Sequence, residues 1–135
     1  MNKQRLRKYA NLIAVCGVNV QKGQEVIINA GLDQPEFVRM TVEECYKAGA
    51  SKVTVDWHYQ PLQKLHYRYR SMKTLTTLEE WEVAKMQLSV ERLPAMIHII
   101  SDDPDGLRGI NQEKVTKTQQ ALYPIIKPLD RKSVV

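Results

Sequence analysis

The stretch Glu25-Val-Ile-Ile-Asn-Ala30 is a short, almost wholly apolar run, which is typical of a strand covered on both faces of a parallel sheet. A second run, Lys52-Val-Thr-Val-Asp-Trp57, follows after a helical pattern. In that pattern Asp33 is the expected N-cap, Pro35 suits the first turn, and Gly49 is expected to end the helix. Strand, helix and strand in this order predict a βαβ unit with parallel strands.

A third apolar run leads straight into an acidic turn. The segment reads Ala95-Met-Ile-His-Ile-Ile-Ser-Asp-Asp-Pro-Asp-Gly-Leu-Arg-Gly109. Residues 95–100 predict a strand, and Asp103-Pro-Asp-Gly106 is a strong turn sequence. We interpret His98, which lies between isoleucines, as a hydrogen-bonded core or edge residue.

Polar residues follow each predicted strand. The carboxyl ends of parallel strands meet at one edge of a sheet, which is where open α/β sheets bind ligands. Carboxylate and imidazole groups together suit zinc or manganese, but the same acidic sequence is what a tight turn before a helix requires, and we favour the turn. We therefore expect a cavity rim or interface, and not a metal site, formed by Asn29, His58, Asp102, Asp103 and Asp105.

Helical patterns surround these runs. Besides the helix between the first two strands, we expect helices at about 3–17, 61–70, 77–90 and 111–123. Thr77 and Asn111 are the expected caps of the last two, and Pro124 is expected to end the last one. The sequence thus predicts an α/β fold: a three-layer α/β/α arrangement with a small parallel sheet, Rossmann-like or flavodoxin-like, in a single domain over residues 1–135. Because three strands make a thin sheet, we expect the sheet to be incomplete.

The composition is that of a globular protein. Of 135 residues, 43% are hydrophobic and 26% are charged, and no apolar run approaches the roughly 20 residues that span a bilayer. The basic N-terminus is expected to begin a helix and not a signal peptide. Cys16 and Cys45 fall at apolar helix positions, so we expect two buried cytosolic thiols without a disulfide.

Other chemistries find little support in the sequence. The loop after the first strand lacks a Gly-x-Gly-x-x-Gly pattern, and no P-loop occurs. No His-Glu-x-x-His pair is present, so no tight metal site is expected in this chain.

The net charge of +5 is a reason to consider nucleic acid as a binding partner. The segment 65–73 alternates aromatic and basic residues, which is typical of a surface that stacks bases and binds phosphates. The alternative is a helix in which Tyr67 and Tyr69 pack while Arg68 and Arg70 stay in water. We favour the helix and expect no nucleic-acid partner.

Several segments in order resemble a known family. They are Lys8-Tyr-Ala-Asn-Leu-Ile13, Gly17–Gln24, Cys45-Tyr-Lys-Ala-Gly-Ala50, Val53-Thr-Val-Asp-Trp57 and Ile100–Leu107. Together they resemble the opening of the aminopeptidase T/aminopeptidase S family of bacterial metallo-aminopeptidases, and the similarity runs through essentially the whole chain.

This resemblance implies a longer, two-domain, dimeric cytoplasmic enzyme that removes amino-terminal residues from peptides with a pair of divalent metal ions, such as zinc or cobalt. The family's metal ligands lie in its C-terminal domain, so no catalytic or metal-binding residue is carried over to this sequence. The chain is then expected to be the N-terminal domain, a scaffold and cavity wall that is inactive alone. Its expected partners are the catalytic domain, a second copy in a homodimer, and peptide substrates, with no membrane.

Overall fold

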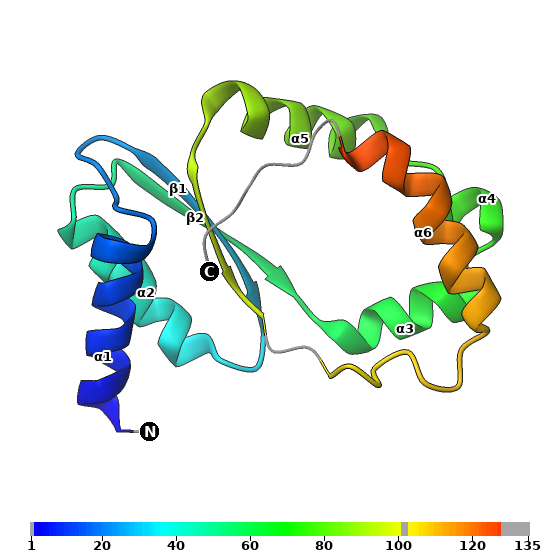
Figure 1. The fold of residues 1–135 in the computed structure, drawn as a ribbon, viewed down its shortest axis with the longest axis horizontal. Coiled ribbons are helices and arrows are strands. Elements are labelled where there is room, and N and C mark those ends of the chain that lie inside the picture. The colour runs from blue at the N-terminus through cyan, green and yellow to red at the C-terminus, as the bar shows by residue number, and fades with distance from the viewer. Residues whose placement is uncertain (1, 101–102, 128–135) are drawn as a thin grey trace. The chain divides into compact units, whose positions relative to one another are not determined.

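The computed structural model describes residues 2–100 and 103–127, so Asp102 lies outside the described residues (Figure 1). These residues form two compact units. The first unit holds residues 2–58 and 94–100, and the second holds residues 59–93 and 103–127. Each unit is described by itself, and the single domain expected for residues 1–135 stays a prediction.

The first unit is built on a parallel sheet. Its strands are β1 (Glu25–Gly31), β2 (Lys52–His58) and β3 (Ala95–Ile99), in the order β2-β1-β3, and both neighbouring pairs are parallel. This confirms the predicted α/β class and the parallel sheet. A central first strand with the second and third on either side is also the order that opens doubly wound flavodoxin-like sheets.

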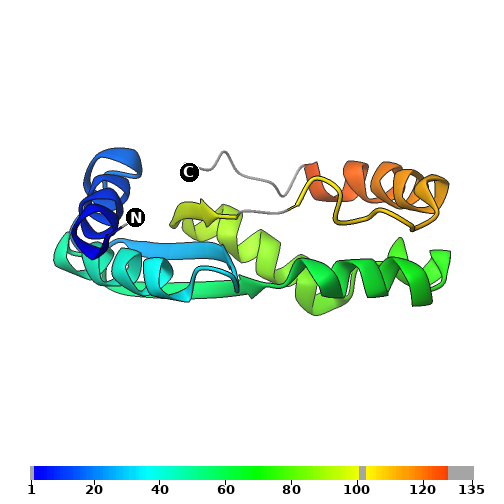
Figure 2. The same ribbon diagram turned by 90° about the horizontal axis from the view of Figure 1, so that it is seen from below.

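Two helices of this unit pack together beside the sheet. Helix α1 (Lys3–Leu12) runs alongside α2 (Pro35–Lys47), as Figures 1 and 2 show. Asn2 caps α1, since its side-chain oxygen accepts a hydrogen bond from the backbone N–H of Arg5 at 2.8 Å. The core lies between these helices and one face of the sheet, where Ile28, Val38 and Ile97 are almost fully buried.

The two faces of β1 differ within this unit. Val26, Ile28 and Ala30 are buried, whereas Ile27 and Asn29 on the other face are half-buried. The expectation of full burial on both faces was therefore wrong for the second face, which is the face that carries the polar residues described below.

The first helix ends in a π-helical turn, η1 (Ile13–Gly17), which contains Cys16. The N–H of Val18 donates to the carbonyl oxygen of Ile13 at 2.9 Å, which is the wider hydrogen bond of a π-turn. Ala14 is buried on the same stripe as Ala10 and Ile13, whereas Cys16 is exposed, so the expectation of a buried Cys16 was wrong.

The start of α2 corrects the predicted cap. Gln34, and not Asp33, occupies the N-cap position, because Pro35 is the first helical residue and a residue before proline avoids the helical conformation. The predicted end is confirmed, since α2 stops at Lys47 and Gly49 follows with φ +111°.

The second unit is helical. It contains α3 (Gln60–Tyr69), a short α4 (Met72–Leu75), α5 (Glu80–Arg92) and α6 (Gln112–Ile126), and α4 contacts α6. Its core is small, and the buried residues in it are Tyr67, Leu75, Ile110 and Val115. Among the described residues no helix is both long and apolar enough to cross a bilayer.

Two helix boundaries in this unit differ from the predicted ones. Glu79 caps α5 in a reciprocal pair with Glu82, whereas the Thr77 hydroxyl donates to the carbonyl oxygen of Lys73 at 2.6 Å and closes α4. Helix α6, which Asn111 caps as predicted, continues past Pro124. Pro124 lacks one N–H, but the N–H of Lys127 still donates to the carbonyl oxygen of Tyr123, so the last turn forms.

The basic segment is only partly as predicted. Tyr67 is buried and Arg68 and Arg70 are exposed, as expected of a helix at the protein surface. Tyr69, however, is 77% exposed. Successive helix positions point about 100° apart, so two tyrosines that are two residues apart face nearly opposite sides of α3.

Candidate functional site at the carboxyl edge of the sheet

A row of polar side chains crosses the sheet near its carboxyl edge. Asn29 on β1 is in register with Asp56 on β2 and with His98 on β3. Residues in register in a parallel sheet share a face, so these three lie side by side on the face opposite Ile28. All three are half-buried. We call this set, together with His58, the polar row.

His58 joins the row from the end of β2. It lies two residues beyond Asp56, hence on the same face, and its Nε2 is 3.5 Å from Oδ1 of Asn29. This separation is at the outer limit for a hydrogen bond. The structure thus brings together Asn29 and His58, two of the predicted rim residues, while their role in a rim stays a prediction.

Asp56 and His98 were not among the predicted site residues. Both lie inside strands and do not follow them, and His98 was interpreted as a core or edge residue. It does lie on β3, an outer strand of the sheet. The alternation of side chains along a strand would have found both, because Asp56 is two residues before His58 and His98 is four residues before Asp102, and both of these were predicted rim residues.

The acidic turn after β3 lies in the second unit and is closed by hydrogen bonds among its own residues. Oδ1 of Asp103 accepts a hydrogen bond from the N–H of Asp105 at 2.9 Å, and the carbonyl oxygen of Asp103 accepts one from the N–H of Gly106 at 2.9 Å. Asp103 and Asp105 are both exposed. The geometry agrees with the favoured interpretation of this sequence as a turn.

Gln60 fixes the position of this turn. Its Nε2 donates to the carbonyl oxygen of Asp103 at 2.7 Å, and its Oε1 accepts from the N–H of Asp103 at 2.9 Å. A side chain at Gly106 would meet the same amide, because a Cβ built there comes within 3.0 Å of both Nε2 and Cδ of Gln60. The small residue at position 106 therefore permits the Gln60–Asp103 pair.

The described residues do not form a metal centre. In residues 2–100 and 103–127, no group of three or more histidine, cysteine, aspartate or glutamate side chains is placed to hold a metal ion. The residues present thus do not fit a metal, and no step through a metal is derived from them.

The buried Cys45 is not an activated nucleophile. Burial, and to a smaller extent the negative charge of Glu44, raises the pKa of the Cys45 thiol to about 11. The thiolate is the nucleophilic form, so Cys45 is unreactive near neutral pH.

Comparison with known proteins decides the family. A family model described as thermophilic metalloprotease (M29) matches residues 2–134. The chain belongs to the M29 family. This confirms the resemblance seen in the sequence and makes the chain a relative of metallopeptidases.

The M29 relatives are aminopeptidases and are much longer than this chain. Aminopeptidase AmpS of Bacillus subtilis (strain 168) is 37% identical over 118 residues, which are 87% of this chain and 29% of that protein. Aminopeptidase T of Thermus thermophilus is 32% identical over 126 residues, which are 93% of this chain and 31% of that protein.

A solved M29 structure has the same fold. The structure described as wild-type AmpT from Thermus thermophilus matches with a TM-score of 0.84 at 32% identity, and the match covers 94% of this chain and 32% of that one. The chain therefore spans about a third of the length of the relatives that it matches.

Proposed function

We propose that this chain is the N-terminal domain of a metal-dependent aminopeptidase that removes amino-terminal residues from peptides. The observation that carries the proposal is the match over residues 2–134 to a metallopeptidase family whose named relatives are aminopeptidases about three times as long. The absence of a metal-holding group among the described residues supports a catalytic site outside this region.

The polar row is the part of this domain that we assign to the active-site cavity. It lies at the carboxyl edge of a parallel sheet, where α/β folds bind their ligands. Asn29 and His58 of this row are two of the rim residues expected from the sequence, against which the catalytic domain or the substrate would be placed. The role of the row is to position and to hydrogen-bond, while the metals do the chemistry elsewhere.

The remaining properties of the whole enzyme follow from the resemblance. The catalytic domain would hold two divalent ions, zinc or cobalt, which activate water and polarise the scissile carbonyl. The enzyme would be a cytoplasmic homodimer acting on peptides. The chain alone would be inactive.

A chimera tests the proposal. This chain replaces the matching segment of Bacillus subtilis AmpS, and both the chimera and the chain alone are assayed with an aminoacyl chromogenic substrate and added cobalt or zinc. We expect turnover by the chimera only. Turnover by the chain alone that disappears on Asp102→Ala would overturn the proposal.

The same chimera tests the rim. His58→Ala is expected to raise KM by about tenfold, the effect of losing one or two hydrogen bonds to substrate, with the chimera still folded. His66→Ala is the control, because His66 is an exposed histidine on α3 outside the polar row. Equal kinetics for both variants would show that the polar row does not line the active-site cavity.

A second candidate function is binding of single-stranded RNA. The observation that favours it is the exposed Tyr69 between the exposed Arg68 and Arg70, an arrangement that can stack a base and contact phosphates. Affinity for an oligonucleotide that falls with salt and is lost on Tyr69→Ala would support it.

A further inference from the structure

A pocket lies between the first two helices of the first unit. Its volume is about 410 Å³, and it is lined by Arg7, Lys8, Asn11 and Leu12 of α1 and by Glu44 of α2. This is within the usual size range of small-molecule sites. No lining residue belongs to the sheet, so the pocket is distinct from the polar row.

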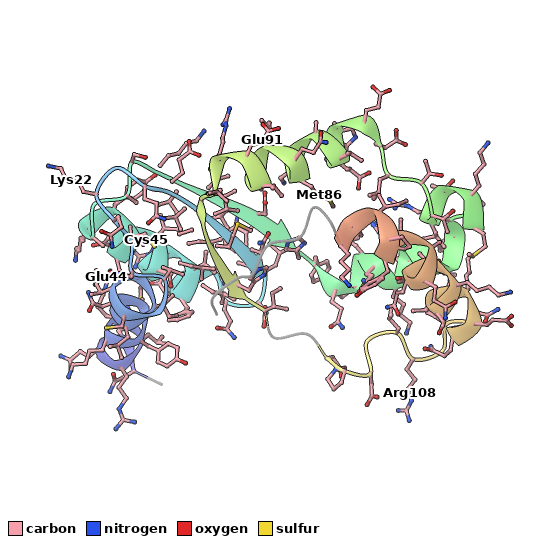
Figure 3. The ribbon with its side chains drawn as sticks, turned by 45° about the horizontal axis from the view of Figure 1, so that its top comes forward. Lys22, Glu44, Cys45, Met86, Glu91 and Arg108 are labelled. Atoms are coloured by element: carbon pink, nitrogen blue, oxygen red, sulfur yellow. The ribbon has the colours of Figure 1, made fainter. Side chains whose placement is uncertain are left out.

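Glu44 is the unusual residue of this pocket. It is only 5% exposed, and its Oε2 has no hydrogen-bond partner among the described residues. The closest cation that pairs with it is Lys47, whose Nζ is 3.8 Å from Oε2. Figure 3 labels Glu44 on α2, close to α1. A buried carboxylate oxygen without a donor is costly, so Oε2 needs a donor that the described residues do not supply.

The cations of the pocket are not equivalent. Nη1 of Arg7 forms an ion pair with Oε2 of Glu43 at 3.1 Å, but like Oε2 of Glu44 it is a buried atom without a hydrogen-bond partner among the described residues. Lys8 is exposed and makes no ion pair with the described residues. The pocket therefore offers one carboxylate and one ammonium group that lack strong partners, together with a guanidinium nitrogen that can still donate, and the Asn11 amide and the apolar Leu12 lie in the same lining.

These groups restrict the chemistry of a ligand. A simple cation would satisfy Glu44 but would also meet the positive charges of Arg7 and Lys8. A simple anion would satisfy Lys8 and would leave Glu44 without a donor. A ligand with both charges on one small frame satisfies the two groups together.

We propose that this pocket binds a free α-amino acid. Glu44 receives the α-ammonium group, Lys8 receives the α-carboxylate, and Leu12 contacts an apolar side chain. Amino acids are the products of the proposed aminopeptidase, so such a site would report on product concentration. Binding itself needs no turnover, and its failure would leave the proposed function untouched.

Calorimetric titration of the chain tests the proposal with three probes. L-leucine carries both charges, N-acetyl-L-leucine lacks the ammonium, and L-leucinamide lacks the carboxylate. We expect saturable binding of L-leucine and at least about tenfold weaker binding of each blocked compound, since each loses one charge-assisted contact. No saturable binding of L-leucine up to about 10 mM, a Kd that corresponds to less than about 3 kcal/mol, would overturn the proposal and leave water as the partner of Glu44.

Matched variants locate the site. Glu44→Gln keeps the side-chain volume, Lys8→Gln removes the second charge, and Lys22→Gln removes an equal charge from an exposed turn outside the pocket. The first two are expected to weaken L-leucine binding by at least about tenfold and the third to leave it unchanged. If circular dichroism shows that Glu44→Gln does not fold, L-leucine binding by the exposed variant Lys8→Gln decides whether the pocket is the site. L-leucine binding that Lys8→Gln leaves unchanged would place the site elsewhere.

Discussion

The side-chain amide of Gln60 pairs with both backbone groups of Asp103, a residue 43 positions later in the chain. The amide imitates a short piece of strand, because it donates to the carbonyl oxygen and accepts from the N–H of one residue. The pair joins the start of α3 to the acidic turn, and the orientation of the turn depends on it.

Gln60→Ala is therefore expected to loosen the acidic turn. The N–H of Asp103 loses its acceptor, so its hydrogen exchange should accelerate, and the free energy of unfolding should fall by about 1 kcal/mol because the site is exposed. Amide exchange followed by NMR measures the first effect. Gln63→Ala, an exposed change on the same helix, is the control, and equal exchange in both variants would contradict the role of Gln60.

Gly106→Ala should break the same pair from the other side. The new Cβ would overlap the Gln60 amide, which must move away. We expect the amide of Asp103 to exchange as fast as in Gln60→Ala. A double-mutant cycle checks the cause, since the cost of Gly106→Ala should shrink once Gln60 is alanine. Additive costs would show that the two residues act independently.

The two thiols should differ strongly in reactivity. Cys16 is exposed, whereas Cys45 is buried with its pKa raised to about 11, so at pH 8 only about one thousandth of Cys45 is thiolate. Alkylation at pH 8 is expected to modify Cys16 and to spare Cys45, as peptide mass spectrometry would detect. Both should react in denaturant, and rapid native labelling of Cys45 would contradict its burial.

Acid should weaken the contact between α1 and α2. The Arg7 guanidinium beside Glu43 holds the pKa of that carboxylate below the ordinary value. The stabilisation is complete above the unfolded-state pKa and is lost as the pH falls through the lowered native value. Glu43→Gln should consequently lose less stability than the wild type between about pH 5 and pH 3 in urea titrations.

Glu91→Gln is the control for this pH dependence. It removes the same charge from α5, outside the Arg7–Glu43 contact. It should keep the wild-type loss of stability in acid. An unchanged acid response in Glu43→Gln would show that the Arg7–Glu43 contact contributes nothing to the pH dependence.

The strands could be predicted from the sequence because burial in a parallel sheet leaves a simple signal. The run at 25–30 and the run at 95–100 correspond to β1 and β3 within one residue. The helix boundaries were harder, since several residues compete for the same end. Asp33 and Thr77 both have good capping side chains, but Pro35 and the Glu79–Glu82 pair decide where α2 and α5 begin.

The candidate site could be predicted only in part. Asn29 and His58 were among the predicted rim residues near the carboxyl ends of their strands, whereas Asp56 and His98 were not. Their alignment with Asn29 depends on register, which pairs residues that are distant in the sequence. No residue pattern in the segment 13–17 predicts the π-helical turn that ends the first helix.

The strand order β2-β1-β3 leaves both margins of the sheet open. Among the described residues, β2 and β3 each pair with β1 alone, so each keeps one row of backbone N–H and C=O groups without a strand beside it. Such a row is a template for another strand. A strand added beside β2 or β3 would extend the sheet without breaking the ladders that join these strands to β1.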